Sequence, residues 1–306
     1  MVRVIPVFFL VFVFMNDLQS QSFRSYYLQA DSLHRAGDFL EASLMYDKAF
    51  ELRKEIAYGF YYNPAYNNAL AGNKRKSIEQ FEKLIAGGFI DFNLIVDDEK
   101  LQVLHEEPGW SNLLKIIEER ELELDRKLVA ELKILDDKDQ MFRQLSGCRE
   151  QRLTKTQNSL FSKFIETQDS LNLISITDII DQNGWPGKKK VGAAGNMTVW
   201  LIIQHADIST QEKYLPILEE SVLQGESQAK HLAMLQDRIL MRKGLKQKYG
   251  SQVRRNRDTN QYEIYPIEDV EDVDKRREAI GLAPMDEYLQ RWKLTMKANY
   301  PYEVEE

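Results

Sequence analysis

The chain has 306 residues, which is enough for two domains because one hydrophobic core rarely serves more than about 250–300 residues. With 43% hydrophobic and 29% charged residues and no low-complexity tract, the composition is typical of a soluble globular protein. The 41 basic and 48 acidic residues give a net charge of −7, which argues against broad nucleic-acid binding.

Residues 1–22 are typical of a secretory signal peptide. Arg3 supplies a positive start, and Val4–Met15 is apolar except for Pro6. This run is shorter than the roughly 20 residues that a membrane-spanning helix needs, and Ser20 or Ser22 provides a small residue before cleavage. We therefore predict export to the periplasm or the medium, with a Gram-negative type of envelope and membrane contact only before cleavage. The alternative is an uncleaved N-terminal anchor.

Cys148 is the single cysteine, so the chain forms no intramolecular disulfide. A reactive thiol is one interpretation. Because no histidine lies near it in sequence, a small buried or half-buried residue is the preferred one. The apolar core must then supply the stability of an exported protein.

Residues 23–112 carry a pattern of small and aromatic residues that repeats along the chain. The first unit contains Tyr26, Ala30, Leu33, Gly37, Phe39, Ala42, Tyr46 and Ala49. The second contains Tyr61, Ala65, Gly72, Ser77 and Phe81, and departs from the apolar pattern at Asn68 and Lys74. The pattern resembles the tetratricopeptide repeat, which implies paired helices that dock a partner protein or peptide. The alternative is a spacer that orients the next domain.

A long amphipathic helix is predicted over residues 111–138, and its segment 113–138 links the repeats to the next domain. The segment lacks glycine and proline, and its leucines recur at spacings of three and four. The helix is expected to continue, straight or bent, toward a break at Gly147.

Residues 139–306 are predicted to form a helical domain with one small β-hairpin, so the fold class of the chain is mostly α. Helices are expected over residues 153–168, 170–182, 197–206, 210–224, 226–243, 268–280 and 284–299. Residues 197–206 also fit a buried strand, but their helical neighbours favour a helix. Ser209 is expected to cap the helix that begins at Thr210. Alternating residues over 251–255 and 261–265, on either side of Arg257–Asn260, predict the hairpin.

The C-terminal region also carries an ordered series of motifs: GWPG, QHAD, LQDRILM, YGSQ and PIEDVEDVDKRR. The series resembles an uncharacterised bacterial family, known only as a domain of unknown function, over roughly Lys138–Leu289. Asp139, Gln140 and Arg143 resemble the opening element of that family. Ser251 stands where the family more often has threonine, and Lys188–Lys190 replace a less basic loop. The resemblance identifies residues that this chain shares with the family, but it assigns no role to them.

His205 and Asp207, two positions apart in the QHAD motif, are the candidate catalytic pair. In a hydrolytic enzyme His205 would act as a general base and Asp207 would orient its imidazole. Arg238 would stabilise an anion or oxyanion. This hypothesis requires His205, Asp207, Arg238, Asp237 and Gln252 to converge on a water-accessible cavity. The alternatives are a mixed nitrogen and oxygen metal site and a structural histidine that holds helices together.

Further polar residues are candidates for binding a ligand: Gln140, Arg143, Gln204, Asp237, Tyr249 and Gln252. The glycines and lysines of residues 184–196 would suit a phosphate at a helix N-terminus. They lack the P-loop arrangement, so a solvated loop is the preferred interpretation. We predict no metal ligand and identify no cofactor or oligomeric state.

The leading hypothesis is an exported envelope protein whose repeats dock a partner and whose C-terminal domain binds a ligand. The competing hypothesis is a hydrolase with a site centred on His205 and Asp207.

Overall fold

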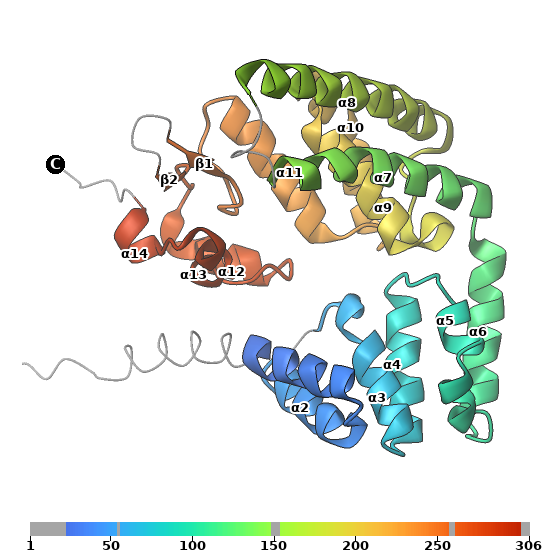
Figure 1. The fold of residues 1–306 in the computed structure, drawn as a ribbon. Coiled ribbons are helices and arrows are strands. Elements are labelled where there is room, and N and C mark those ends of the chain that lie inside the picture. Colours follow the sequence, from blue (N-terminus) through green and yellow to red (C-terminus); the bar gives the residue numbers. More distant parts are fainter. Residues whose placement is uncertain (1–22, 54–55, 148–153, 257–260, 301–306) are drawn as a thin grey trace, which may run out of the picture. The chain divides into compact units, whose positions relative to one another are not determined.

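The computed structural model describes residues 23–53, 56–147, 154–256 and 261–300 (Figure 1). The predicted signal peptide, residues 1–22, and Cys148 lie outside these residues. The chain divides into two compact units, residues 1–122 and 123–306. As predicted, the fold is mostly α with one small β-hairpin. Among the described residues, no helix is both long and apolar enough to cross a membrane.

The first unit begins with two helical hairpins. Residues 23–36 are helical and pair with α2 (Phe39–Glu51), and α3 (Tyr62–Leu70) pairs with α4 (Lys74–Ala86). Gly37 and Gly72 take positive φ angles of 81° and 87° at the two turns, a conformation that glycine adopts without strain. Each hairpin fully buries one small residue on each helix and one ring, at matching spacings: Ala30, Ala42 and Tyr46, then Ala65, Ser77 and Phe81. These small residues let the paired helices approach closely.

The remainder of the first unit consists of η1 (Tyr58–Phe60), α5 (Asn93–Val96), η2 (Glu99–Leu104) and α6 (Trp110–Glu123). The predicted continuous helix over 113–138 is wrong, because the chain breaks between α6 and α7 (Arg126–Gly147). The side chain of Asp125 accepts a hydrogen bond from the Leu128 backbone N–H at 3.0 Å. The backbone N–H of Asp125 donates to the Lys190 carbonyl at 2.9 Å. Asp125 therefore starts a new helix as its N-cap.

The second unit contains a bundle of five described helices around one apolar core (Figure 1). They are α7, α8 (Lys155–Asn183), α9 (Lys188–His205), α10 (Ile208–Leu223) and α11 (Ala229–Arg242). The other four all contact α9. The centre of the core is formed by Leu132, Ile176, Val199, Ile203, Leu218 and Leu235. Helix α9 is therefore the element around which the bundle is packed.

Helix α8 is one element, so the prediction of separate helices over 153–168 and 170–182 is wrong. Thr154 and Gln157 form a reciprocal capping box at its start. Ser170, a residue type that often starts a helix, instead donates its hydroxyl to the Glu166 carbonyl at 2.9 Å. This bond, back to the preceding turn, lets a serine lie inside a helix.

Helix α9 starts earlier than predicted and is kinked. Residues 188–191 form a helical turn where a loop was expected, and Gly192 follows with a φ of 70°. The chain then stays helical to His205, which confirms the helix predicted over 197–206. A Cβ on Gly195 would lie 3.1 Å from the Leu132 side chain, so the missing side chain lets α7 and α9 pack closely.

The C-terminal segment has a small core of its own. Strand β1 (Val253–Arg255) pairs antiparallel with β2 (Tyr262–Ile264), which confirms the predicted hairpin. The elements η3 (Val270–Asp272), α12 (Val273–Glu278), α13 (Met285–Leu289), η4 (Gln290–Trp292) and α14 (Met296–Asn299) follow. The single helix predicted over 284–299 is wrong, because Lys293 takes a left-handed φ of 59° and interrupts it. Ile264, Ile267, Val273, Met285 and Leu289 form the core.

Candidate functional site

A cleft of about 200 Å³ opens where α9 ends and α10 begins. It is lined from α7 by Asp139, from α8 by Asp169, Ser170 and Leu173, and from the end of α9 onward by Ile202, His205, Ala206 and Asp207. Residues of α7, α8 and α9 and the two residues between α9 and α10 thus line one small cavity with both polar and apolar walls. His205 is the histidine among the lining residues, and the side chain of this last residue of α9 is 24% exposed.

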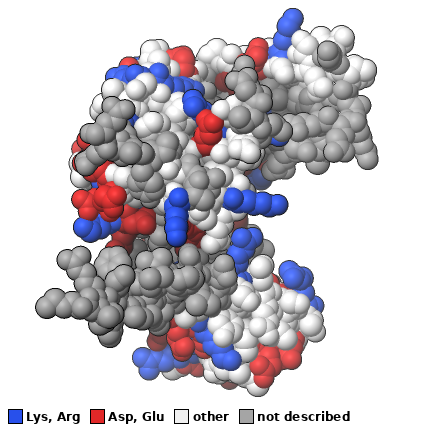
Figure 2. Space-filling model, turned by 90° about the vertical axis from the view of Figure 1, so that its left-hand side faces the viewer, with Lys and Arg blue, Asp and Glu red and all other residues white. Residues whose placement is uncertain are grey.

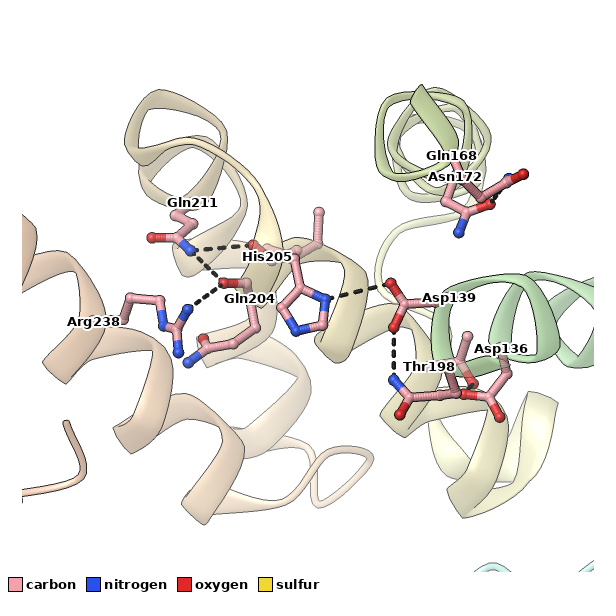
Figure 3. A network of polar contacts seen from close by, with 11 residues as sticks. Asp136, Asp139, Gln168, Asn172, Thr198, Gln204, His205, Gln211 and Arg238 are labelled. Atoms are coloured by element: carbon pink, nitrogen blue, oxygen red, sulfur yellow. Dashed lines mark hydrogen bonds and ion pairs between the residues drawn. The ribbon is translucent and has the colours of Figure 1, made fainter. Parts of the chain in front are cut away.

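The carboxylate that faces His205 belongs to Asp139 on α7 (Figure 3). Its Oδ1 atom lies 3.4 Å from His205 Nδ1, across 66 positions of sequence. The Asp139 side chain is only 3% exposed, and its Oδ2 atom accepts a 2.6 Å hydrogen bond from the Gln140 amide. A buried carboxylate beside one ring nitrogen favours the tautomer with its proton on that nitrogen. The other nitrogen can then accept a proton.

Asp207 does not orient His205, so this part of the prediction is corrected. Its carboxylate accepts hydrogen bonds from the Ser209 hydroxyl at 2.6 Å and from the Thr210 backbone N–H at 2.9 Å. These bonds make Asp207, rather than Ser209, the N-cap of α10. They also lower the pKa of its carboxyl, the Ser209 bond most strongly, because they stabilise the charged form. Asp207 still lines the cleft, at its exposed edge.

Gln204 and Arg238 interact on the side of α9 that faces α11 (Figure 3). Gln204 is 3% exposed and donates its amide to the Met234 carbonyl at 3.3 Å. Arg238 Nη1 donates to the Gln204 carbonyl at 3.3 Å, and Arg242 donates to the Ala206 carbonyl at 2.5 Å. Two cations thus satisfy carbonyls at the C-terminal end of a helix, where positive charge is favourable. Burial, and then Arg242, lower the pKa of Arg238.

Asp237, Tyr249 and Gln252 connect α11 to the C-terminal segment. Asp237 is fully buried and accepts backbone hydrogen bonds from Lys248 at 2.7 Å, Tyr249 at 3.0 Å and Ser251 at 2.9 Å. Gln252 is also buried, and its amide donates to Ser251 Oγ at 2.9 Å. The five side chains of the enzyme hypothesis therefore do not converge on one cavity. His205 and Asp207 line the cleft, whereas Asp237, Arg238 and Gln252 do not.

The α7 element contributes more to the site than its sequence indicated. Gln140 contacts Asp139, and the side chain of Arg143 lies outside the described residues. One turn earlier, Asp136 accepts a hydrogen bond from the Thr198 hydroxyl at 3.3 Å, and burial raises the pKa of this carboxyl. Asp169 and Ser170 line the cleft but were not predicted. Nothing in the local sequence of α8 distinguishes them from solvent-facing residues.

The glycine- and lysine-bearing start of α9 is bound by a carboxylate of the protein itself, that of Glu226. The Lys189 backbone N–H donates to Glu226 Oε2 at 3.0 Å, and Lys188 N–H donates to the Glu226 carbonyl at 2.9 Å. Asn196 donates from inside α9 to the Pro186 carbonyl at 2.9 Å and to Ser227 Oγ at 2.7 Å. Glu226 thus occupies the place that an external anion would take at a helix N-terminus.

Two further observations bear on the chemistry. Among the described residues, no group of three or more His, Cys, Asp or Glu side chains could hold a metal ion. On the face drawn in Figure 2, basic and acidic side chains are interspersed over the described residues. Such a surface produces no field of a single sign.

The comparisons with known proteins concern the second unit. Residues 126–299 match the model of a family of unknown function (DUF6624), from the first residue of α7 to the last residue of α14. The chain belongs to this family. The DUF6624 match starts earlier and ends later than the predicted span of Lys138–Leu289, and it includes both the cleft and the C-terminal segment. Comparison with curated proteins found no match, and comparison with solved structures found none.

Proposed function

We propose that the DUF6624 domain binds a small polar ligand in the cleft beside His205. The observation that carries this proposal is the pairing of His205 with Asp139 on the cleft wall. These residues come from two separate motifs, and His205 keeps part of its ring exposed. Perturbed or paired titratable groups in a cleft are a general mark of functional sites.

The dimensions and lining of the cleft limit the ligand. Its volume of about 200 Å³ is below the range of roughly 300–1,000 Å³ that is usual for drug-sized ligands. The lining combines carboxylate, hydroxyl and imidazole groups with the apolar side chains of Leu173, Ile202 and Ala206. A compact molecule that carries hydroxyl or amine groups fits this chemistry, because these groups donate hydrogen bonds to carboxylates.

A thermal-shift screen tests the binding proposal. The panel contains small amines, amino acids, monosaccharides and inorganic phosphate, at millimolar concentrations. At least one probe should raise the Tm of the wild-type chain, and His205→Gln should abolish that rise. A ligand at about 100 times its Kd adds about 2.7 kcal/mol, which is readily detected. His105→Gln, in the first unit, is the matched control. A panel without effect, or a shift that survives in His205→Gln, would refute the proposal.

An acid–base enzyme is the second candidate, and the same His205–Asp139 contact favours it. In this version Asp139 takes the role that the sequence assigned to Asp207, and Arg238 has none because it does not line the cleft. A positioned general base contributes typically 10²–10⁴-fold to a rate.

Chromogenic esters, phosphate esters and anilides provide the test of the enzyme candidate. If one of them is hydrolysed, Asp139→Asn should lower kcat by about 10²-fold or more, whereas Asp207→Asn should leave it nearly unchanged. Equal losses in both variants would contradict the assignment of Asp139.

We further propose that the two helical hairpins of the first unit are tetratricopeptide-like and dock a partner protein or peptide. The equivalent burial of Ala30 with Ala42 and of Ala65 with Ser77 supports the repeat. The rings of His34, Phe39, Tyr62 and Tyr66 form a half-buried cluster, with neighbouring centroids 5.7–6.3 Å apart. Aromatic side chains are enriched in protein interfaces.

A photo-crosslinking residue in place of Tyr66 should yield a discrete adduct in cells of the source organism. The same residue in place of Leu44, which is 45% exposed on α2, is the control. Adducts at neither position would favour the spacer role.

Export to the cell envelope completes the proposal and rests on the sequence of residues 1–22. Fractionation of cells that produce the full chain or a chain without these residues tests it. The full chain should appear in the envelope or the medium, and the shortened chain in the cytoplasm.

A further inference from the structure

Arg238 and Arg242 on α11 carry two positive charges that no carboxylate of the described residues neutralises. They lie four positions apart, so both side chains project from one face of the helix. Arg238 Nη1 donates to the Gln204 carbonyl at 3.3 Å (Figure 3), and Arg242 Nη1 donates to the Ala206 carbonyl at 2.5 Å. Within the described part of the chain, neither guanidinium group has a further hydrogen bond or an ion pair. The fold therefore leaves a pair of cations without a counter-ion.

The acidic residues closest to this pair in sequence, or on the facing helix, already have partners. Asp237 directly precedes the first arginine, but its buried carboxylate accepts three backbone N–H groups of the segment that follows α11. Asp207 directly follows the segment that anchors the second arginine, and its carboxylate caps α10. Glu212 on α10 forms an ion pair with Lys243. None of these carboxylates is left to serve as the counter-ion.

The carbonyl groups at the end of α9 offset only part of the positive charge. A helix C-terminus is equivalent to about −0.5 of an elementary charge, so about +1.5 remains from the two guanidinium groups. Burial, and then the charge of Arg242, lower the pKa of Arg238, which shows that the two cations repel each other. Like charges four positions apart destabilise a helix. An anion bound by both side chains would remove this repulsion.

Both side chains also keep hydrogen-bond donors that an anion can use. A guanidinium group has five N–H donors, and each arginine gives one bond to a carbonyl of α9. The Nε–H group of Arg238 is buried without an acceptor, so the protein alone does not saturate this side chain. Arg238 is half-buried and Arg242 is exposed, so a ligand can reach the pair from the Arg242 side.

The charge of the pair favours a phosphoryl group over a carboxylate. A phosphoryl group carries about −1.5 to −2 charges at pH 7, which balances the remaining positive charge, whereas a carboxylate carries a single charge. A phosphoryl group also has three strong acceptor oxygens. Because the arginine fork binds phosphate oxygens in a bidentate manner, one such group can accept hydrogen bonds from both side chains.

We propose that Arg238 and Arg242 bind a phosphoryl group, as inorganic phosphate or as part of a small molecule, at the junction of α9 and α11. Neither arginine lines the cleft beside His205. This second site therefore does not rest on the ligand proposed for the cleft. The two sites are nevertheless neighbours, because Ala206 lines the cleft and its carbonyl holds Arg242.

Equilibrium dialysis of the full chain against radiolabelled phosphate tests the site, at pH 7 and at low ionic strength because salt screens exposed charges. The wild-type chain should bind one phosphate with a Kd below about 1 mM. Arg242→Gln should raise this Kd about 10-fold or more, because charge-assisted hydrogen bonds are lost. Arg242→Lys keeps the charge but not the fork, so it should recover only part of the affinity.

The matched control is Arg75→Gln, which removes a cation whose side chain is 88% exposed in the first unit. Its phosphate binding should equal that of the wild-type chain. Arg238→Gln provides a second variant of the site, and circular dichroism shows whether each variant is folded. A wild-type chain that binds no phosphate would overturn the proposal. Binding that is unchanged in folded Arg238→Gln and Arg242→Gln would also overturn it.

Two further arms identify the source of the phosphoryl group and separate this site from the cleft. Glycerol 3-phosphate that displaces labelled phosphate more strongly than inorganic phosphate does would indicate a phosphorylated small molecule, whereas equal displacement would indicate the free anion. His205→Gln should bind phosphate as the wild-type chain does. Sulfate should compete for the arginine pair, so a saturating concentration of sulfate in the ligand screen of the cleft blocks this site. Failure of one proposal then leaves the other standing.

Discussion

Both ends of α9 carry backbone groups that the helix itself leaves without partners, and the two ends differ in what surrounds those groups. At the N-terminal end, backbone N–H groups and the Asn196 amide are bound by Glu226, Pro186 and Ser227. At the C-terminal end, arginines from α11 hold the last carbonyls, yet His205 faces a cleft. The comparison shows that a glycine- and lysine-rich helix start is no ligand site when the protein supplies its own anion. The open end is where a ligand has room.

The largest effect is expected at the closed end. Asn196→Ala leaves the buried Pro186 carbonyl without its donor, at a cost of about 1–3 kcal/mol, and removes one of two hydrogen bonds of Ser227 Oγ, at about 0.5–1.5 kcal/mol, so the free energy of unfolding should fall by about 3 kcal/mol. Urea denaturation at pH 7 measures it. Asn112→Ala, which removes an exposed hydrogen bond to Glu82, should change the value by less than about 0.5 kcal/mol. A loss below about 1 kcal/mol at Asn196 would show that this end is not sealed.

The packing of α11 against the middle of α9 should make the free energy of unfolding depend on pH. His231 is 4% exposed and its ring stacks on Trp200 at 4.4 Å. Burial, and then Lys230, lower its pKa from 6.5 to about 4. The unfolded chain therefore binds this proton first as the pH falls, and stability is lost between about pH 6.5 and 4. The loss amounts to roughly 3 kcal/mol at about 1.4 kcal/mol per pKa unit.

Chemical denaturation from pH 7 to pH 4 measures this loss. His231→Gln should show a smaller decrease than the wild-type chain, because it has no proton to take up. Parallel pH profiles in the two proteins would contradict the assignment.

At the open end, the cap of α10 should contribute a moderate amount. Asp207→Ala should lower the free energy of unfolding by about 1 kcal/mol at pH 7, and Asp207→Asn by much less, because asparagine also caps helices. The lowered pKa of Asp207 means that its contribution is present above the unfolded value and disappears as the pH falls through the folded value. The difference in Tm between Asp207→Ala and the wild-type chain should therefore be smaller at pH 3 than at pH 7.

The smallest effect on stability is expected at His205. His205→Gln should change the free energy of unfolding by less than about 0.5 kcal/mol, because the ring borders a cleft and its contact with Asp139 is long. His205→Gln should nevertheless abolish ligand binding. A Tm loss of several degrees would instead make His205 a packing residue and bring the two ends of α9 closer in character.

The sequence predicts the helices and the hairpin of this fold better than it predicts which side chains contact each other. Gly225 and Gly244 end helices as expected, and the hairpin lies where alternation indicated it. The pairing of His205 with Asp139 was missed because proximity in sequence pointed to Asp207. Asp207 lies two positions after the end of α9 and directly before α10. Its side chain therefore caps α10 by accepting the Thr210 N–H, and does not contact His205. Nothing local to residue 139 indicates a contact across 66 positions.

Asp237 has a consequence for how the molecule opens. Its carboxylate is shared by the amide protons of Lys248, Tyr249 and Ser251, at the point where α11 passes into the C-terminal segment. If that segment detaches, all three amides lose their acceptor together, and a buried charge must be hydrated at the same time. Hydrogen exchange at these three positions should therefore have one common opening free energy and proceed as a single cooperative unit.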